Sequence, residues 1–325
     1  MRYKLRRKKE ADDMYSTRNI QVFIPTIENM EISSFLQLIQ LHNQIVKIKK
    51  KLLMENKSIS FNFSKCYNLQ TNGIAYLGAI SSWLSSQGIL VSYNFNSMNK
   101  SVTNAFKNVG FLQKHFHNHF ENEAIPSTAI DFEQFQGDIR SEVELNNRVI
   151  KYITDKWLSQ NNILMMPKLK DDLKSKIFEL FANALEHSGS NLGCFCCGNN
   201  TTLSKKQELT LTLIDLGIGI AESVQEYFKE RKGYLLENNI EALKWAFEEG
   251  NTTRESQFGG LGLALVEDFL DIADGSMEVY CNNVLLQIKG KEKSTDFIPY
   301  NFQGTIINIR LHPTDGRYGY KDEFT

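Results

Sequence analysis

The sequence is poor in several features that would assign it to a class at once. It has five cysteines in 325 residues and no paired CxxC motifs, which argues against a disulfide framework and a zinc ribbon. No apolar run is long enough to cross a bilayer, and the first residues lack the apolar core of a signal peptide. The formal net charge of −1 gives no overall field that would hold nucleic acid or an anionic membrane. We therefore expect a cytoplasmic protein that binds neither.

Residues 1–125 are predicted to form one α/β domain. The segments "SISFNFS" (58–64) and "ILVSYNF" (89–95) have the patterns of strands, and the residues between them have helical apolar spacing. That helix is predicted to end at Gly88, a residue type favoured at helix C-caps. Residues 126–141 are rich in polar side chains and contain Pro126, so we predict a linker there.

A second domain is predicted over residues 142–325. Two helices, 142–160 and 170–188, precede two strands, "LGCFCCG" and "ELTLTLIDLG". A polar, helical interval follows at 221–250. The chain then passes through a glycine-rich turn and a helix to strands near 276–288 and to "GTIINIRL". The cysteines of "CFCC" are expected to fill a strand, because small thiols bury well.

The helix over 170–188 carries an unusual polar stripe. Glu179, Asn183 and His187 are four residues apart, so they share one helical face beside the apolar stripe. An amide oxygen suits Mg²⁺, and a carboxylate one turn away is placed to act on a water molecule or hydroxyl. Taken alone, such a stripe is more often the solvated flank of a helix.

The turn in "LIDLGIGI" (213–220) predicts a base-binding site. Gly217 and Gly219 permit a tight turn with close backbone approach. A dinucleotide fingerprint would need a small third residue where this chain has Glu222. Asp215 is an acceptor that would repel phosphate but would pair with the exocyclic amine of adenine.

The segment "QFGGLGLAL" (257–265) is the better candidate for binding phosphate. Its glycines, Gly259, Gly260 and Gly262, precede a helix, and backbone amides at a helix N-terminus bind anions. The alternative is a flexible loop before a capped helix. The pattern GxxxxGK[ST] is absent, which excludes a P-loop.

In this order, the motifs resemble those of the GHKL superfamily, which includes gyrase-type topoisomerases, heat-shock chaperone ATPases, histidine kinases and mismatch-repair ATPases. "ELFANALEHS", "DLGIGI" and "GGLGLAL" match its N, G1 and G2 boxes, and the resemblance covers roughly residues 142–312. It implies a Bergerat-type α/β sandwich, a mixed sheet with helices on one face. ATP would bind between the helical layer and a mobile lid, residues 221–258.

The resemblance also implies a role for each matching residue. Asn183 would coordinate Mg²⁺, Asp215 would bind the adenine amine, and Glu179 occupies the general-base position of the hydrolysing members. Thr305 matches the adenine-side threonine, and His187 is typical of the anti-sigma and two-component subgroups. Apart from the resemblance, Arg254 in the predicted lid is a candidate charge-assisted donor that closes onto the γ-phosphate, with a solvated surface arginine as the alternative. The glycines that would shape the pocket are Gly217, Gly219, Gly259, Gly260 and Gly262.

The first domain resembles a STAS domain, the fold of anti-sigma-factor antagonists. That family carries a phosphorylatable serine at the start of its helix, where this chain has Asn72. Thr71 is the neighbouring hydroxyl and is predicted to be the helix N-cap.

The sequence thus predicts an α/β protein with a STAS-like βαβα domain fused to a GHKL-type domain that binds ATP and Mg²⁺ in signalling. Three activities stay open: ATP hydrolysis that drives a conformational switch, an anti-sigma-type protein serine/threonine kinase, and a nucleotide-sensing adaptor that does not hydrolyse ATP. A sensor histidine kinase is disfavoured, because no histidine precedes the ATP-binding region in the required context. The expected partner is a regulatory target protein, and a homodimer is left open.

Overall fold

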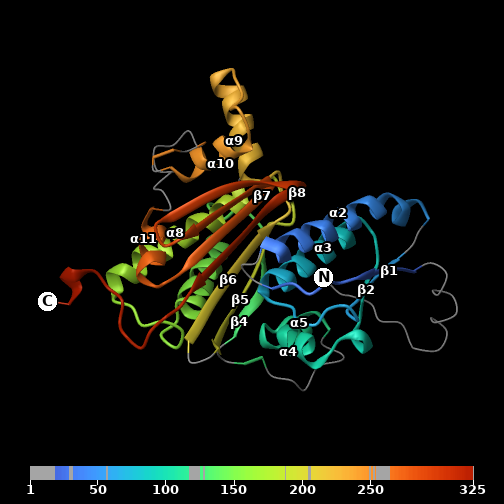
Figure 1. Cartoon of the computed structure of the whole chain (residues 1–325), viewed down its shortest axis with the longest axis horizontal. Helices are drawn as coiled ribbons and strands as arrows, with labels where there is room; N and C mark the ends of the chain where they lie inside the picture. Colours follow the sequence, from blue (N-terminus) through green and yellow to red (C-terminus); the bar gives the residue numbers. More distant parts are fainter. Residues whose placement is uncertain are drawn as a thin grey trace. The chain divides into compact units, whose positions relative to one another are not determined.

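The computed structural model describes residues 19–28, 32–55, 58–116, 125–126, 129–186, 188–203, 206–248, 250–251, 253 and 264–324 (Figure 1). The chain divides into two compact units, Met1–Ser127 and Thr128–Thr325. None of the helices in these ranges combines the length and apolarity that crossing a bilayer requires.

The first unit alternates strands and helices around a small parallel sheet. In chain order the elements are β1 (Asn19–Phe23), α2 (Ile32–Met54), β2 (Ser58–Asn62), α3 (Thr71–Ser86), β3 (Val91–Asn94), the 3-10 turn η1 (Phe95–Ser97), α4 (Lys100–Asn108) and α5 (Phe111–His115). The strand order is β1-β2-β3, and both pairs are parallel. The alternation predicted for β2, α3 and β3 is therefore present. Strand β1 is an addition, and its five residues are too few to give a clear alternating pattern.

The start of α3 corrects one detail of the sequence interpretation. The N-cap is Gln70, which makes no side-chain capping bond, and Thr71 is already the first helical residue. Asn72 is fully buried, and its amide donates to the carbonyl of Glu28 at 3.2 Å. Its Oδ1 accepts from the amide of Gly73 at 2.7 Å. Asn72 therefore ties the helix start to the loop after β1.

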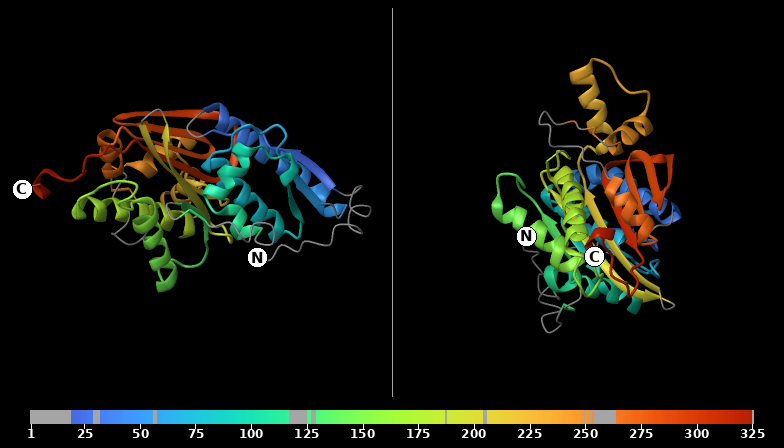
Figure 2. Two further views of the ribbon diagram at one scale, coloured as in Figure 1. Left: turned by 90° about the horizontal axis from the view of Figure 1, so that it is seen from below. Right: turned by 90° about the vertical axis from the view of Figure 1, so that its left-hand side faces the viewer.

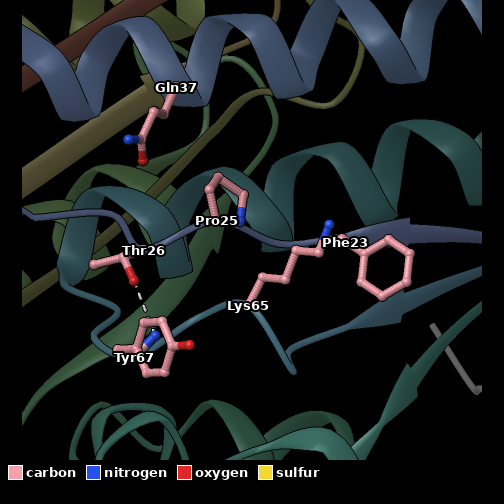
Figure 3. Close-up of a pocket in the computed structure, with 6 residues that line it drawn as sticks. All are labelled: Phe23, Pro25, Thr26, Gln37, Lys65 and Tyr67. Carbon is pink, nitrogen blue, oxygen red and sulfur yellow. Dashed lines mark hydrogen bonds between the residues drawn. The ribbon is translucent and has the colours of Figure 1, made fainter.

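A hollow of about 400 Å³ lies where β1 and β2 end, the edge at which parallel α/β sheets usually bind ligands (Figure 3). It is lined by Phe23, Pro25, Thr26, Gln37, Lys65 and Tyr67. The Lys65 ammonium lies 4.7 Å from the centroid of the Phe23 ring. The amide of Tyr67 donates to Thr26 Oγ1 at 2.9 Å. No residue singled out from the sequence lines this hollow.

A buried imidazole links α2 to α3 and makes this unit sensitive to acid. His42 Nδ1 lies 3.4 Å from the hydroxyl of Tyr76, and both side chains are buried. Burial lowers the pKa of His42 from 6.5 to about 4. Between pH 6.5 and about 4, His42 is therefore mostly protonated in the unfolded chain and mostly neutral in the folded unit. The free energy of unfolding consequently decreases as the pH falls through this range.

We expect His42 to cost the first unit about 2 kcal/mol of stability between pH 7 and pH 5, given 1.36 kcal/mol per unit of pKa difference. Hydrogen exchange of α2 and α3 in the full chain measures this as a loss of protection. In His42→Gln, which cannot titrate, the loss should be smaller than in the wild type at the same pH. Equal pH sensitivity in the two proteins would contradict this.

The second unit contains a five-stranded sheet and several helices. Its elements are β4 (Ile130–Phe135), α7 (Val143–Lys151), the π-helix η2 (Tyr152–Trp157), α8 (Pro167–Glu186), β5 (Cys194–Leu203), β6 (Lys206–Asp215), α9 (Ile220–Tyr227), the π-helix η3 (Phe228–Lys232), α10 (Asn239–Phe247), α11 (Ala264–Ile272), β7 (Ser276–Lys289), β8 (Glu292–Leu311) and the 3-10 turn η4 (Lys321–Glu323). Helices α9 and α10 project beyond the end of the sheet (Figures 1 and 2), and we call residues 220–247 the arm.

The prediction of a linker over residues 126–141 is partly wrong, because this stretch contains strand β4. This strand pairs antiparallel with β5, and Phe135 lies opposite Cys194. The side chains of Ile130, Phe132 and Phe135 are buried, whereas the acidic residues between them are only partly so. Because acidic residues alternate with the buried ones, the sequence of this half-buried strand resembles that of a loop.

The sheet also differs from the expected mixed sheet. Its order is β4-β5-β6-β8-β7, and each pair described is antiparallel. The physical reason is connectivity. Only two residues separate β5 from β6, and two separate β7 from β8, and so short a connection can only join antiparallel neighbours. Strand β8 then enters between β6 and β7, in the opposite direction to both.

Helices α7 and α8 lie along one face of the sheet (Figure 2). The core on that face includes alternate residues of three strands, such as Leu211 and Leu213 of β6, Ile307 and Ile309 of β8, and Val279 of β7. It also includes Leu173, Ile177 and Leu180, which belong to the apolar stripe predicted for α8. Since strand side chains alternate between faces, this register decides which polar residues point toward the helices.

Candidate functional site

A row of four residues crosses the sheet at the end of β6. Asp215 lies opposite Cys194 of β5 on one side and Thr305 of β8 on the other, and Thr305 in turn lies opposite Cys281 of β7. Asp215 is two residues beyond Leu213, so its side chain is on the helix-facing side. All four side chains are buried. The sheet therefore brings together two predicted site residues, Asp215 and Thr305, between two thiols.

Asp215 is a buried carboxyl group whose charge is only partly compensated. Its side chain is 4% exposed, and its Oδ1 accepts from the backbone amide of Gly217 at 2.9 Å. Burial raises the pKa of Asp215 from 3.8 to about 7, although hydrogen bonds from Gly217 and Thr305 act in the opposite direction. A carboxylate in this dry position is a strong acceptor for a ligand N–H group.

Both glycines of the predicted turn are required by close backbone approach. A Cβ at Gly217 would collide with the backbone carbonyl of Ser188. Gly219 has a φ of +87°, and a Cβ there would lie 2.5 Å from Asn282 Oδ1 and 2.9 Å from the carbonyl of Gly304. The amide of Ile218 donates to the carbonyl of Ser188 at 2.7 Å. The turn is thus held against the segment that follows α8.

Helix α8 carries two residues of the predicted polar stripe, Glu179 and Asn183. Glu179 is half-buried and Asn183 is exposed, beside a stripe that is buried. Glu186 continues the same face, seven residues after Glu179, and is mostly buried.

Arg140 is a cation beside this stripe that the sequence did not reveal. Its Nε lies 2.6 Å from Glu186 Oε1. The carboxylates of Glu186 and Glu179 both raise the pKa of Arg140, Glu186 by the larger amount. Arg140 precedes α7 by a few residues, in the stretch predicted to be a linker, so no periodic pattern marked it. The stripe therefore contains a paired carboxylate and, one turn before Asn183, a second carboxylate within the field of the same arginine.

The cysteines behave as the strand pattern indicated. Cys194, Cys196 and Cys197 are all buried in β5, and burial raises the pKa of the Cys194 and Cys196 thiols. Within the described ranges, no group of three or more His, Cys, Asp and Glu side chains is arranged to hold a metal ion.

Five predicted site residues lie outside the described residues: His187, Arg254, Gly259, Gly260 and Gly262. Their proposed roles stay predictions. Glu179, Asn183, Asp215, Gly217, Gly219 and Thr305 are all in the second unit, on α8, at the end of β6, in the turn after it and on β8.

Comparison with known families supports a nucleotide-binding interpretation of this region. Residues 169–315 match the family described as histidine kinase-, DNA gyrase B-, and HSP90-like ATPase. The matched range begins in the first turn of α8 and ends just after β8, so it contains all six residues named above. A search of curated proteins finds none that matches the chain. A domain of this family type is therefore found at residues 169–315, which suggests that the protein binds ATP.

Proposed function

We propose that the protein is a regulatory ATP-binding protein in which Mg·ATP, bound by the second unit, controls a protein partner. The observation that carries this proposal is the buried Asp215 at the end of β6, beside Thr305 and the two-glycine turn, inside the matched family range. A buried acceptor of this kind suits the exocyclic amine of adenine. The proposal includes closure of a lid made of residues 221–258 over the nucleotide.

The proposed turnover step uses α8. Asn183 would supply a neutral oxygen ligand to Mg²⁺, which prefers oxygen ligands and retains several waters. Glu179, one turn earlier, would accept the proton of an attacking water or of a partner's hydroxyl. In either case the oxygen would attack the γ-phosphorus of ATP, the bond from that phosphorus to the β–γ bridging oxygen would break, and ADP would leave. Water would yield ADP and free phosphate, and the hydroxyl would yield ADP and a phosphorylated partner. The first outcome is an ATPase switch, and the second is an anti-sigma-type kinase.

The first unit is proposed to be a STAS-like regulatory domain. Its β2–α3–β3 arrangement, with parallel strands on either side of a helix, supports this. Asn72 is buried, has no hydroxyl to phosphorylate and makes two local hydrogen bonds, so we assign it a structural role at the helix start. All five cysteines are free thiols, which fits a reducing compartment such as the cytoplasm.

Calorimetric titration of the protein with ATP, with and without Mg²⁺, tests the proposal. We expect saturable binding that Mg²⁺ tightens. Incubation with γ-labelled ATP, alone and with candidate partners, then separates the three activities, because label appears as free phosphate, on protein, or on neither. Absence of any ATP binding would overturn the proposed function.

We expect Asn183→Ala to abolish the tightening of ATP binding by Mg²⁺ while the fold is retained. Asn183 is exposed on α8, and alanine is the better helix former. Asn104→Ala is a matched control, because Asn104 is an exposed helical asparagine in the first unit. If the affinity of Asn183→Ala responds to Mg²⁺ as the wild type does, then Asn183 is not the metal ligand.

A further inference from the structure

Helix α9 begins directly after Gly219, which has no side chain with which to cap it. A helix leaves its first backbone amides without partners inside the helix, and these are usually satisfied by an N-cap side chain. Gly219 is the N-cap of α9 and makes no such bond. The first amides of this helix therefore require acceptors from elsewhere.

Strand β7 supplies those acceptors from sixty residues away. Asn282 Oδ1 accepts from the amide of Glu222 at 3.3 Å, and Asn282 Nδ2 donates to the carbonyl of Ile218 at 2.9 Å. The thiol of Cys281 is within hydrogen-bonding reach of the amides of Ile220 and Ala221. Cys281 and Asn282, which are consecutive in β7, thus contact the turn and the first amides of α9.

The backbone at Asn282 is shaped for this task. Its φ is +53°, a left-handed conformation that asparagine tolerates better than most residues. The register between β7 and β8 shifts on both sides of Asn282. Irregularities of this kind re-aim a side chain and are common next to functional sites. The side chain is 6% exposed, so its hydrogen bonds are shielded from water.

The next residue holds the other helix of the arm. Asn283 Oδ1 accepts from Asn239 Nδ2 at 3.0 Å, and Asn239 is the first residue of α10. Within the arm, Gln225 of α9 exchanges two hydrogen bonds with the backbone of Leu236, at 2.9 and 3.3 Å. Tyr227 stacks on Trp245 with ring centroids 5.7 Å apart. The arm is therefore one packed body that two adjacent asparagines attach to β7.

We propose that Asn282 and Asn283 form a clasp that anchors the first turns of α9 and α10, at the base of the proposed lid, to the sheet, and that Asn282 is a positioning residue for the nucleotide site. This inference rests on the proposed function. The turn that Asn282 holds is the one whose Gly217 amide contacts Asp215. With Ser188 on one side and Asn282 on the other, the turn cannot shift without moving the hydrogen bonds of the adenine-binding carboxylate.

The same geometry explains why this turn is not a phosphate cradle. The amide of Glu222 already bonds to Asn282, and the amides of Ile220 and Ala221 lie against the Cys281 thiol. An anion would have to displace both, so the phosphates belong elsewhere in the site.

The decisive variant is Asn282→Gly, compared with Asp274→Gly. Glycine relieves the left-handed backbone at both positions, since Asp274 has a φ of +48°. Only Asn282→Gly removes the clasp, because Asp274 lies in the turn before β7 and pairs with the exposed Lys206. We expect Asn282→Gly to weaken ATP about tenfold and to lower hydrogen-exchange protection of the first turn of α9 about tenfold. We expect Asp274→Gly to change neither.

Two further variants separate the parts of the clasp. Asn282→Asp keeps an acceptor for Glu222 but places a carboxylate oxygen against the carbonyl of Ile218, so ATP should again bind about tenfold more weakly. Asn283→Ala should reduce protection at the start of α10 and change ATP affinity less than threefold, because Asn283 does not touch the turn.

Wild-type ATP affinity in both Asn282 variants would overturn the positioning role. Unchanged exchange at α9 in Asn282→Gly would overturn the clasp itself. If the wild type does not bind ATP, the proposed function fails, and the exchange experiment still decides whether the clasp exists. If Asn282→Gly does not fold, the isosteric Asn282→Asp carries the test.

Discussion

Asp215→Asn is expected to weaken ATP binding by about tenfold to a hundredfold. A buried, charge-assisted hydrogen bond contributes on the order of 1.5–3 kcal/mol, and each 1.4 kcal/mol is a factor of ten in affinity. The carboxylate can only accept, whereas the asparagine amide can present its own N–H group to the adenine amine. Isothermal calorimetry of both proteins at the same Mg²⁺ concentration measures the difference.

The purine base provides the control for that experiment. Guanine has a carbonyl oxygen where adenine has its amine, so Asp215→Asn should lose affinity for ATP and not for GTP. The affinity for ATP relative to that for GTP should therefore be lower in Asp215→Asn than in the wild type. Equal ATP affinity in wild type and variant would remove the base-recognition role of Asp215 and leave its burial as a structural feature.

The raised pKa of Asp215 adds a pH dependence to the same measurement. With a pKa of about 7, the free carboxyl group is mostly neutral at pH 6 and mostly ionised at pH 8. If ATP requires the ionised form, its affinity rises about tenfold over this interval, and binding near pH 7 releases a proton. Asparagine cannot titrate, so this component should vanish in Asp215→Asn. Titration of the phosphates themselves affects both proteins alike.

The same pKa shift affects folding stability in the opposite direction to ATP affinity. Because the folded pKa is above the value of 3.8 expected for an exposed carboxyl, the free folded state holds a proton that the unfolded chain releases. Stability of the nucleotide-free domain therefore decreases as the pH rises toward and through about 7. A bound adenine amine would offset this loss, since it stabilises the ionised form.

Features that depend on nearby residues could be predicted from the sequence. The stripe on α8 follows from helical periodicity, and the glycines at 217 and 219 follow from the needs of a tight turn after a strand. The buried neighbours Ser188 and Asn282 explain these glycines, but neither could be paired with the turn in advance. Asn282 is some sixty residues away, and its left-handed backbone depends on the register shift between β7 and β8.

The failures have a common physical cause. Strand β4 was hidden because its polar residues resemble those of a loop, and only pairing with β5 reveals that Ile130 and Phe135 are buried. Arg140 was missed for the same reason, since its partner Glu186 is 46 residues later. The mixed sheet was expected from the resemblance to the GHKL superfamily. The observed sheet is antiparallel, because β8 is inserted between β6 and β7 and runs in the opposite direction to both. Long-range pairing is the information that a single sequence does not display.

Glu179→Gln should have the largest effect of all on turnover, with ATP binding unchanged. If Glu179 accepts the proton of a water or a hydroxyl, its loss lowers the rate roughly 10²–10⁴-fold, because an amide cannot take up that proton. The measurement is release or transfer of γ-labelled phosphate at saturating Mg·ATP, with a partner present. Calorimetry on the same samples confirms that nucleotide still binds.

Glu186→Gln is the matched control for Glu179→Gln. Glu186 is on the same face of α8 and pairs directly with Arg140, so this variant changes the charge around that arginine without removing the proposed base. A large loss confined to Glu179→Gln identifies a proton acceptor. Equal losses in both variants would instead mean that the stripe acts through its charge. Rates in both variants equal to a measurable wild-type rate would eliminate Glu179 as the proton acceptor. Absence of turnover in all three proteins, with ATP still bound, would leave the adaptor that senses ATP without consuming it.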